Sequence, residues 1–336
     1  MQNVLLAALT AFAIVLISGP MVIPMLHRLK FGQVEREEGP QSHKAKQGTP
    51  TMGGLMFVFG AIVAALCFGL SGTEFLLPTL LVMVAFGLVG FLDDFIKVKL
   101  HRNLGLRAYQ KIIAQVGVAF LVAWWAYRSP LIGSELYLPI SGKSWDIGLF
   151  YIPLVMFVIL AEVNAVNLTD GLDGLASGVT MIYAVAMSLV FLILASGAKF
   201  LGETLYGVNL ESMAVFCGAL AGGLLGFLRF NTYPAKVFMG DTGSMALGGA
   251  VSMMAILSRS IILLPLMGIC FVGSALSVVL QVGSYKLRHG KRIFKMAPLH
   301  HHFELLGHPE TRIVSMYILV TAVACALGLL SYTFVR

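Results

Sequence analysis

Ten stretches of this sequence are long and apolar enough to cross a lipid bilayer as helices, and they constrain the fold more than any other feature. Such a helix needs roughly 20 mostly apolar residues to span a hydrocarbon core of ~30 Å. The sequence therefore predicts an all-α polytopic membrane protein with about ten transmembrane helices in one integral membrane domain, residues 1–336. The stretches are residues 4–26, 51–70, 76–95, 109–127, 148–167, 174–196, 211–228, 241–257, 261–287 and 312–333.

Two of these stretches are unusual. Residues 241–257 form the weakest candidate because they are rich in glycine and serine. Residues 261–287 form the longest, and as one helix they would measure about 40 Å, which exceeds the hydrocarbon core. We expect this stretch to tilt, bend or extend beyond the core.

The composition excludes the common soluble classes. Hydrophobic residues make up 58% of the chain and charged residues 12%, about half of the ~25% charge of a soluble domain. Intrinsic disorder is excluded by the same figures, because it requires low hydrophobicity. A net charge of +7 can indicate nucleic acid, but the basic residues lie on one face of the predicted membrane domain, so we expect no nucleic-acid partner.

The lysines and arginines predict the orientation, because cytoplasmic loops carry an excess of both. Segments 27–50, 96–111, 229–236 and 286–312 contain 18 of the 23, and we place these segments in the cytoplasm. Both termini are then periplasmic. On that side, the segment from Glu135 to Gly148 alternates apolar and polar residues around a turn, which predicts a short periplasmic β-hairpin.

Acidic and histidine residues are also distributed unevenly. Five of the six aspartates and all eight histidines lie at the predicted cytoplasmic ends of the spans or in the cytoplasmic loops. A carboxylate near the end of an apolar helix is costly to desolvate, so it usually has a partner or a function. Five such aspartates beside a histidine cluster predict a functional site.

The first two candidate motifs contain aspartates. Adjacent Asp93 and Asp94 suit a divalent metal or a base held by a cation, although a hydrated helix end would also explain them. Asn167, Asp170 and Asp173 recur every three residues and would share a face on a helical turn. A glycine-rich turn with capping aspartates is the alternative for this second motif.

Three further segments offer cationic or metal-binding groups. Asp241 lies near a predicted helix start, where it can bind a metal or serve only as an N-cap. The run from His300 to His302 lacks a zinc-protease spacing, so phosphate contacts are more plausible than a zinc cage. Lys46 and Thr51 lie beside glycine-rich backbone that suits a phosphate, although membrane orientation alone also explains the lysine.

Together these segments predict a site that joins two phosphate-bearing substrates with Mg²⁺. The ion screens repulsion between phosphates and stabilises the charge that develops during phosphoryl transfer. Because the site lies at the membrane face, one substrate is expected to be a lipid phosphate.

Five segments resemble the phospho-N-acetylmuramoyl-pentapeptide transferases, a family within the polyprenyl-phosphate N-acetylhexosamine-1-phosphate transferases. The resemblance extends from about residue 32 to residue 312 in the family's order. The aspartate patterns are shared across the superfamily, whereas GTPTMGG and PLHHHFE are more specific to this branch. The segments are SHKAKQGTPTMGG, FLDDFIK, NLTDGLDGLA, FMGDTGS and APLHHHFE.

This resemblance implies an activity and a location. Phospho-MurNAc-pentapeptide would pass from UDP-MurNAc-pentapeptide to undecaprenyl phosphate with Mg²⁺, giving lipid I and UMP in the first membrane step of peptidoglycan synthesis. The resemblance also implies a homodimer in the bacterial cytoplasmic (inner) membrane, with the active site on the cytoplasmic face and a lipid-facing groove near the long ninth span.

The resemblance implies the following site residues. Asp241 and Asp93 would bind the metal, and Asp93 would also deprotonate the lipid phosphate or attack the β-phosphate as a nucleophile. Asp94 would assist in positioning the metal or the lipid phosphate. His300 would act in catalysis, and it would contact the sugar diphosphate together with His301 and His302. The uridine side would comprise Asn167, Asp170, Asp173, Asn231 and Phe238. The remaining substrate contacts would be Lys46, Thr51, Lys97, Lys111 and Gln281.

Three alternatives belong to other classes. A transferase of GlcNAc-1-phosphate to a polyprenyl phosphate would keep the aspartate motifs, but the HHHFE run argues against it. A UbiA-like prenyltransferase also uses aspartates with Mg²⁺, but at a helical spacing that Asp93 and Asp94 do not match. A secondary transporter would place polar groups near the bilayer midplane. Glu162 is one of the few ionisable residues within a predicted span, and it lies towards the cytoplasmic end of that span.

Overall fold

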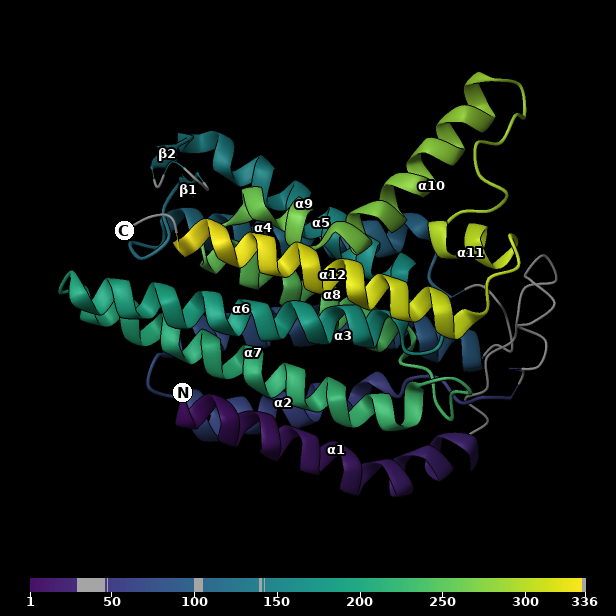
Figure 1. Ribbon diagram of the computed structural model, residues 1–336, viewed down its shortest axis with the longest axis horizontal. Coiled ribbons are helices and arrows are strands. Elements are labelled where there is room, and N and C mark those ends of the chain that lie inside the picture. Colours follow the sequence, from purple (N-terminus) through teal and green to yellow (C-terminus); the bar gives the residue numbers. More distant parts are fainter. Residues whose placement is uncertain (29–45, 47, 100–104, 139–140, 142, 334–336) are drawn as a thin grey trace.

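The protein is an all-α bundle in the computed structural model, which describes residues 1–28, 46, 48–99, 105–138, 141 and 143–333 (Figure 1). Parts of the predicted cytoplasmic segments lie outside these residues, among them Arg102 and residues 42–45 and 47 of the glycine-rich motif. The longest helices run along the long axis of the molecule. They are α1 (Gln2–Arg28), α3 (Thr73–Lys99), α6 (Leu175–Phe200), α7 (Thr204–Asn231) and α12 (Glu310–Thr333).

Every predicted apolar stretch contains helix. The shorter elements are α2 (Gly54–Gly69), α4 (Ala108–Arg128), α5 (Tyr151–Thr169), α8 (Gly240–Leu257), α9 (Leu264–Met267), α10 (Ile269–Leu287) and α11 (Leu299–Glu304). Among the described residues, seven helices are long and apolar enough to cross a membrane. The chain is therefore an all-α polytopic membrane protein.

The longest predicted span is not one helix. Residues 261–287 form a 3-10 turn (Ile261–Leu263), the single turn α9 and then α10. Pro265 lies in the first turn of α9, and Gly268 separates α9 from α10. Proline has no N–H to continue a helix from the preceding residues. Helix α10 leaves the bundle at an angle (Figure 1), so a bend is the outcome among the three that were expected.

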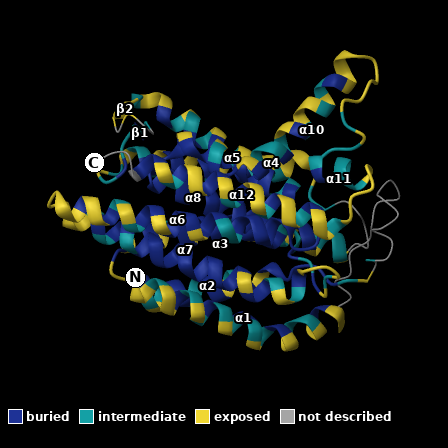
Figure 2. Ribbon diagram, viewed as in Figure 1, coloured by how far each residue is buried: buried dark blue, intermediate teal, exposed yellow. Residues whose placement is uncertain are grey.

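The core of the bundle is built on α7 and α8. Helix α7 packs against α1, α2 and α6, and α8 packs against α3 and α5. Glycines permit close approach of backbones: a Cβ added at Gly222 of α7 would lie 2.0 Å from the carbonyl oxygen of Ala8 in α1. Buried residues concentrate in these central helices, whereas α1 and α10 are largely exposed (Figure 2).

The two ends of the bundle differ in chemistry. The start of α1, the end of α12 and the strands β1 (Glu135–Tyr137) and β2 (Ser144–Asp146) lie at one end (Figure 1). The strands pair antiparallel, with Leu136 opposite Trp145. At the other end, α3 and α5 finish, α4, α8 and α12 begin, and α11 lies beside the start of α12 (Figure 1). This second end holds the predicted site residues.

Candidate active site

Three aspartates from two helices meet at this end of the bundle. Asp93 and Asp94 of α3 and Asp241 of α8 each offer a carboxylate oxygen, and these oxygens lie within 4.8 Å of one another. The close approach of α3 to α8 requires glycine at position 90, because a Cβ there would lie 2.1 Å from the carbonyl oxygen of Asp241. The sequence thus brings carboxylates 147 positions apart into one cluster.

Two lysines neutralise part of this acidic charge. Lys97 Nζ lies 2.6 Å from Asp93 Oδ2 and 2.9 Å from Asp241 Oδ2. Lys111 Nζ, at the start of α4, lies 2.8 Å from the same oxygen of Asp241 and 3.8 Å from Asp93 Oδ2. Asn167 of α5 donates to the other oxygen of Asp241 over 2.8 Å. We call these residues the carboxylate–lysine cluster: Asp93, Asp94, Lys97, Lys111, Asn167 and Asp241.

Asp94 differs from the other two aspartates because it caps α8. Its Oδ2 accepts the backbone N–H of Thr242 at 2.9 Å and the Thr242 hydroxyl at 2.7 Å, and Oδ1 accepts the N–H of Asp241 at 3.2 Å. Helix N-termini have unpaired N–H groups that favour a carboxylate. The alternative in which Asp241 itself is the N-cap is wrong, because α8 begins at Gly240, the N-cap position is Met239, and Asp241 lies within the first turn.

Residues 50–53 of the glycine-rich motif, which we call the strap, link the start of α8 to α2 through backbone hydrogen bonds. Phe238 N–H donates to the Pro50 carbonyl oxygen, and Gly53 N–H donates to the Phe238 oxygen, both over 2.8 Å. Thr51 is buried in this strap. At Gly240, where φ is +72°, an added Cβ would lie 2.6 Å from Thr51 Oγ1 and 2.5 Å from Asp94 Oδ2. Glycine is thus required for the strap to close over Asp94.

A second ionic group lies beside the first. Lys46 Nζ lies 2.7 Å from Asp173 Oδ1 and 2.6 Å from Glu310 Oε1, and all three side chains are nearly buried. Glu310 also accepts the N–H of Asp173, whose Oδ2 accepts the N–H of Ala235. Burial disfavours the ammonium group, but the hydrogen bonds to Asp173 and Glu310 outweigh it and raise the pKa of Lys46. Sequence reasoning missed Glu310, whose only signal is its place as the first residue of α12.

The expected shared face of Asn167, Asp170 and Asp173 does not form. Helix α5 ends at Thr169, so the three residues diverge, with Asn167 in the carboxylate–lysine cluster and Asp173 bonded to Lys46. Asp170 is the C-cap residue of α5. Burial, followed by the negative charges of Asp241, Asp94 and Asp173, raises its pKa well above the usual range.

The side chains of Asn231 and Gln281 form hydrogen bonds with backbone groups of nearby segments. Asn231 is buried at the end of α7, where it accepts from Ser177 and donates to the Val237 carbonyl oxygen. Gln281 of α10 accepts from the N–H groups of Ile293 and Phe294 and donates to the Phe294 oxygen. In the described part of the chain, no hydrogen bond or ion pair joins Gln281 to the carboxylate–lysine cluster.

The three consecutive histidines of α11 point to different neighbours. His300 is buried against Gly171, where an added Cβ would lie 2.1 Å from His300 Nε2. His301 Nδ1 lies 2.7 Å from Glu304 Oε2. His302 Nδ1 accepts the N–H of Lys295 at 3.1 Å. His300 therefore packs against residues 170–173, which we call the aspartate-rich loop.

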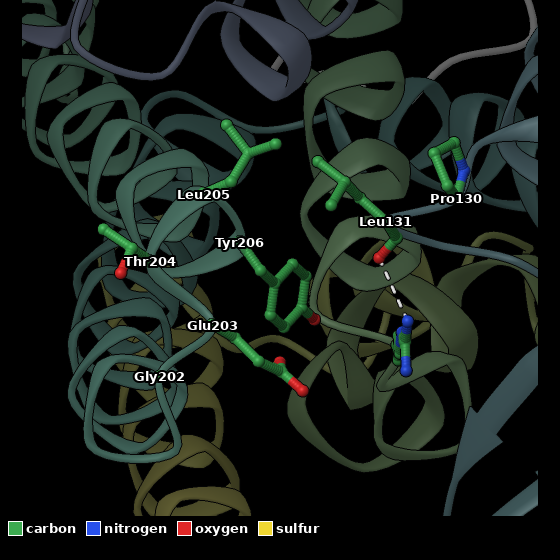
Figure 3. Close-up of a pocket in the computed structure, with 8 residues that line it drawn as sticks. Pro130, Leu131, Gly202, Glu203, Thr204, Leu205 and Tyr206 are labelled. Atoms are coloured by element: carbon green, nitrogen blue, oxygen red, sulfur yellow. Dashed lines mark hydrogen bonds between the residues drawn. The ribbon is translucent and has the colours of Figure 1, made fainter.

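A cavity of about 480 Å³ lies at the opposite end of the bundle (Figure 3). It is lined by Pro130, Leu131, Arg259 and residues 202–206, which lead into the start of α7. Helix α4 separates it from Lys111 by about 30 Å, at 1.5 Å per residue. Arg259 already pairs with Glu135 at 3.2 Å and donates to the Leu131 oxygen, so the described residues that line this cavity include no free cation for a phosphate.

The fold and the site together define a membrane transferase, and comparison with known proteins gives its class. Residues 76–259 match the glycosyl transferase family 4 model. This range includes every residue of the carboxylate–lysine cluster. Residues 46–58, a range that includes Pro50 and Gly53 of the strap, match signature 1 of the phospho-N-acetylmuramoyl-pentapeptide-transferases.

Relatives of similar length agree with that signature. Phospho-N-acetylmuramoyl-pentapeptide-transferases from Clostridioides difficile (strain 630) and Clostridium novyi (strain NT) are 50% and 45% identical to this chain. The alignments cover 96% of both chains for the first relative, and 98% of this chain and 97% of the relative for the second. The chain therefore belongs to the phospho-N-acetylmuramoyl-pentapeptide-transferase family, a family of phosphoglycosyl transferases.

Proposed function

We propose that this protein transfers phospho-MurNAc-pentapeptide from UDP-MurNAc-pentapeptide to undecaprenyl phosphate, forming lipid I and releasing UMP. The observation that carries the proposal is the meeting of three carboxylates and two lysines at one end of a membrane bundle. Family membership supports the muramoyl substrate, because the relatives are named for its transfer.

The proposed reaction exchanges one phosphoanhydride bond for another. An oxygen of the lipid phosphate bonds to the β-phosphorus of the nucleotide sugar, the bond from that phosphorus to the bridging oxygen breaks, and UMP leaves with the electron pair. Both reactants are anions, so the site must supply positive charge. Lys97 and Lys111 supply it next to Asp93 and Asp241.

The aspartates fit a Mg²⁺ site, because this ion prefers oxygen ligands and the three carboxylates converge. Asp94 already accepts three hydrogen bonds from α8, so we assign ion binding to Asp93 and Asp241 and a supporting role to Asp94. Bound Mg²⁺ would screen the phosphates and stabilise the charge that develops during transfer. We assign Asp93 to one of two roles. As a base, it takes the proton of the lipid phosphate before that phosphate attacks directly; as a nucleophile, it bonds to the β-phosphorus and UMP leaves, and the lipid phosphate then attacks the same phosphorus and releases the Asp93 carboxylate.

The remaining residues are assigned by position. Lys46, Thr51 and the 170–173 loop border the carboxylate–lysine cluster on one side, and we assign this side to the nucleotide. Asn231 and Phe238 shape it through backbone contacts. His300, His301 and His302 are assigned to the sugar diphosphate, because α11 packs on the same loop at Gly171. Gln281 orders the segment that leads into α11.

The proposed topology has ten spans, with both termini in the periplasm and the site facing the cytoplasm. It is supported by the shared end of the first and last helices (Figure 1) and by the excess of basic residues at the other end. We propose that the protein acts as a homodimer in the bacterial cytoplasmic membrane.

The test is UMP release by the purified protein with UDP-MurNAc-pentapeptide, undecaprenyl phosphate and Mg²⁺. A parallel arm replaces the nucleotide sugar with UDP-GlcNAc, and a third arm adds EDTA. We expect release with the muramoyl substrate only, lost in EDTA. Release with UDP-GlcNAc only would instead assign the protein to GlcNAc-1-phosphate transfer, and folded protein without activity toward either substrate would overturn both assignments.

A further inference from the structure

We propose that Gln115 and Asn164 are positioning residues, which hold α4 against α5 so that the carboxylate–lysine cluster can assemble. Asn164 Nδ2 donates to Gln115 Oε1 over 2.9 Å. Among the described residues, this is the only side-chain hydrogen bond between the two helices. The inference rests on the proposed function, because it takes Asp241 as part of the reacting site.

The spacing along each helix connects this amide pair to the cluster. Lys111 precedes Gln115 by four positions on α4, and Asn167 follows Asn164 by three on α5, so each pair shares a helix face. Lys111 and Asn167 both contact Asp241 at 2.8 Å, one on each carboxylate oxygen. The amide pair therefore lies one helical turn deeper in the bundle than the carboxylate that it serves.

Helix packing makes this contact necessary. Helix α4 packs mainly on α5, and α5 in turn packs on α8, which carries Asp241. The distance from Lys111 to Asp241 thus depends on how α4 is rotated and shifted against α5. A displacement of about 1 Å in a positioning group can lower a catalytic rate ~100-fold.

Because Gln115 is buried, its side-chain amide depends on a hydrogen bond to Asn164. Its side chain is fully buried, and its Nε2 has no hydrogen-bond partner in the described part of the chain. The bond to Asn164 is therefore the one that holds this amide. Asn164 is itself anchored, because its Nδ2 also donates to the Leu160 carbonyl oxygen at 2.7 Å. An amide inside an apolar bundle strongly favours such a bond over none.

The test replaces the amide and measures three quantities. For Gln115→Leu we expect kcat of UMP release to fall about 10- to 100-fold, as is typical when a group that orients a metal ligand is lost. The KM for the nucleotide sugar should change little, because Lys46 and Asp173 lie on other elements. Mn²⁺ binding to the substrate-free protein, followed by electron paramagnetic resonance, should weaken.

The matched control is Ser188→Ala. This change removes a buried hydrogen bond between helices, from Ser188 Oγ to the Ala214 oxygen at 3.0 Å, away from the cluster. It should lower the melting temperature while leaving kcat and Mn²⁺ binding unchanged. If Gln115→Leu behaves in the same way, the pair is only structural and the inference is wrong.

A rescue experiment restores the amide pair with the two side chains exchanged. The swapped pair Gln115→Asn with Asn164→Gln keeps the two amides and their combined length, so it should recover most of the lost kcat and Mn²⁺ affinity. Should Gln115→Leu fail to fold, Gln115→Asn alone takes its place and is expected to show the same pattern, less severely. Inactivity of the unaltered protein would count against the proposed function, and Mn²⁺ affinity would then decide the inference alone.

Discussion

Glu310 Oε1 lies 2.6 Å from Lys46 Nζ, although 264 positions separate the two residues in the sequence. The contact joins Glu310, the first residue of α12, to Lys46, the first residue of the segment that matches the family signature. Asp173 completes the group by pairing with the same ammonium. The start of the last helix is thereby fastened to the nucleotide side of the proposed site.

The first prediction concerns this contact. Glu310→Gln should lower the free energy of unfolding by about 1–3 kcal/mol, because the amide keeps an acceptor oxygen but removes the negative charge that pairs with the nearly buried Lys46. It should also raise the KM for the nucleotide sugar, since Lys46 loses one of the two carboxylates that hold it. Thermal unfolding in detergent and steady-state kinetics measure the two effects.

The matched control for Glu310 is Glu211→Gln. Glu211 pairs with Lys199 at 2.7 Å, but both side chains are about 40% exposed. Exposed ion pairs contribute less than about 1 kcal/mol, so this variant should unfold and turn over like the unaltered protein. Equal effects from the two changes would show that burial does not strengthen the Glu310 contact.

The second prediction concerns the proposed metal ligands. Asp93→Asn and Asp241→Asn should each abolish UMP release, with turnover at least ~100-fold lower, because each removes a charge that contacts both lysines. Both variants should remain folded on size-exclusion chromatography. Asp146→Asn, at the hairpin on the other end, is the control and should retain full turnover. Near-normal turnover in both cluster variants would eliminate the proposed site.

Much of this architecture could be predicted from hydropathy and charge. An apolar run must bury its backbone polar groups as a helix in lipid, so the spans follow from composition alone. The shared end of Asp93, Asp94 and Asp241 also follows, because each lies at the end of a run that the basic loops place on one side. Their convergence around Lys97 is consistent with that reasoning.

The lateral contacts could not be predicted in this way. Hydropathy reports the depth of a residue along the membrane normal, but not which helices are neighbours. Asn167 therefore could not be assigned to Asp241, nor Lys46 to Glu310. The capping role of Asp94 could not be predicted for the same reason, because the helix that it caps begins 146 positions later, at Gly240. A cap is normally sought in the residues just before a helix.

The third prediction follows from that cap. Asp94→Ala should lower the free energy of unfolding by about 1–2 kcal/mol, the usual cost of losing an N-cap, and should also lower turnover because α8 carries Asp241. Asp94→Asn retains a carbonyl oxygen that can accept from Thr242, so it should preserve more of the stability than Asp94→Ala. Identical melting temperatures for the two variants would contradict the capping role.

The last prediction concerns the fit of α11 on the aspartate-rich loop. A Cβ at Gly171 would lie 2.1 Å from His300 Nε2, and His300 is fully buried. Gly171→Ala should therefore displace α11, cost about 1–3 kcal/mol as an overpacked contact, and reduce turnover by moving His300. Gly117→Ala is the matched control, because nothing lies within 4 Å of an added Cβ there. Alanine is the better helix former inside α4, so this control should keep full turnover and melt no lower than the unaltered protein. Full turnover of Gly171→Ala at normal stability would show that the position of His300 does not matter to the reaction.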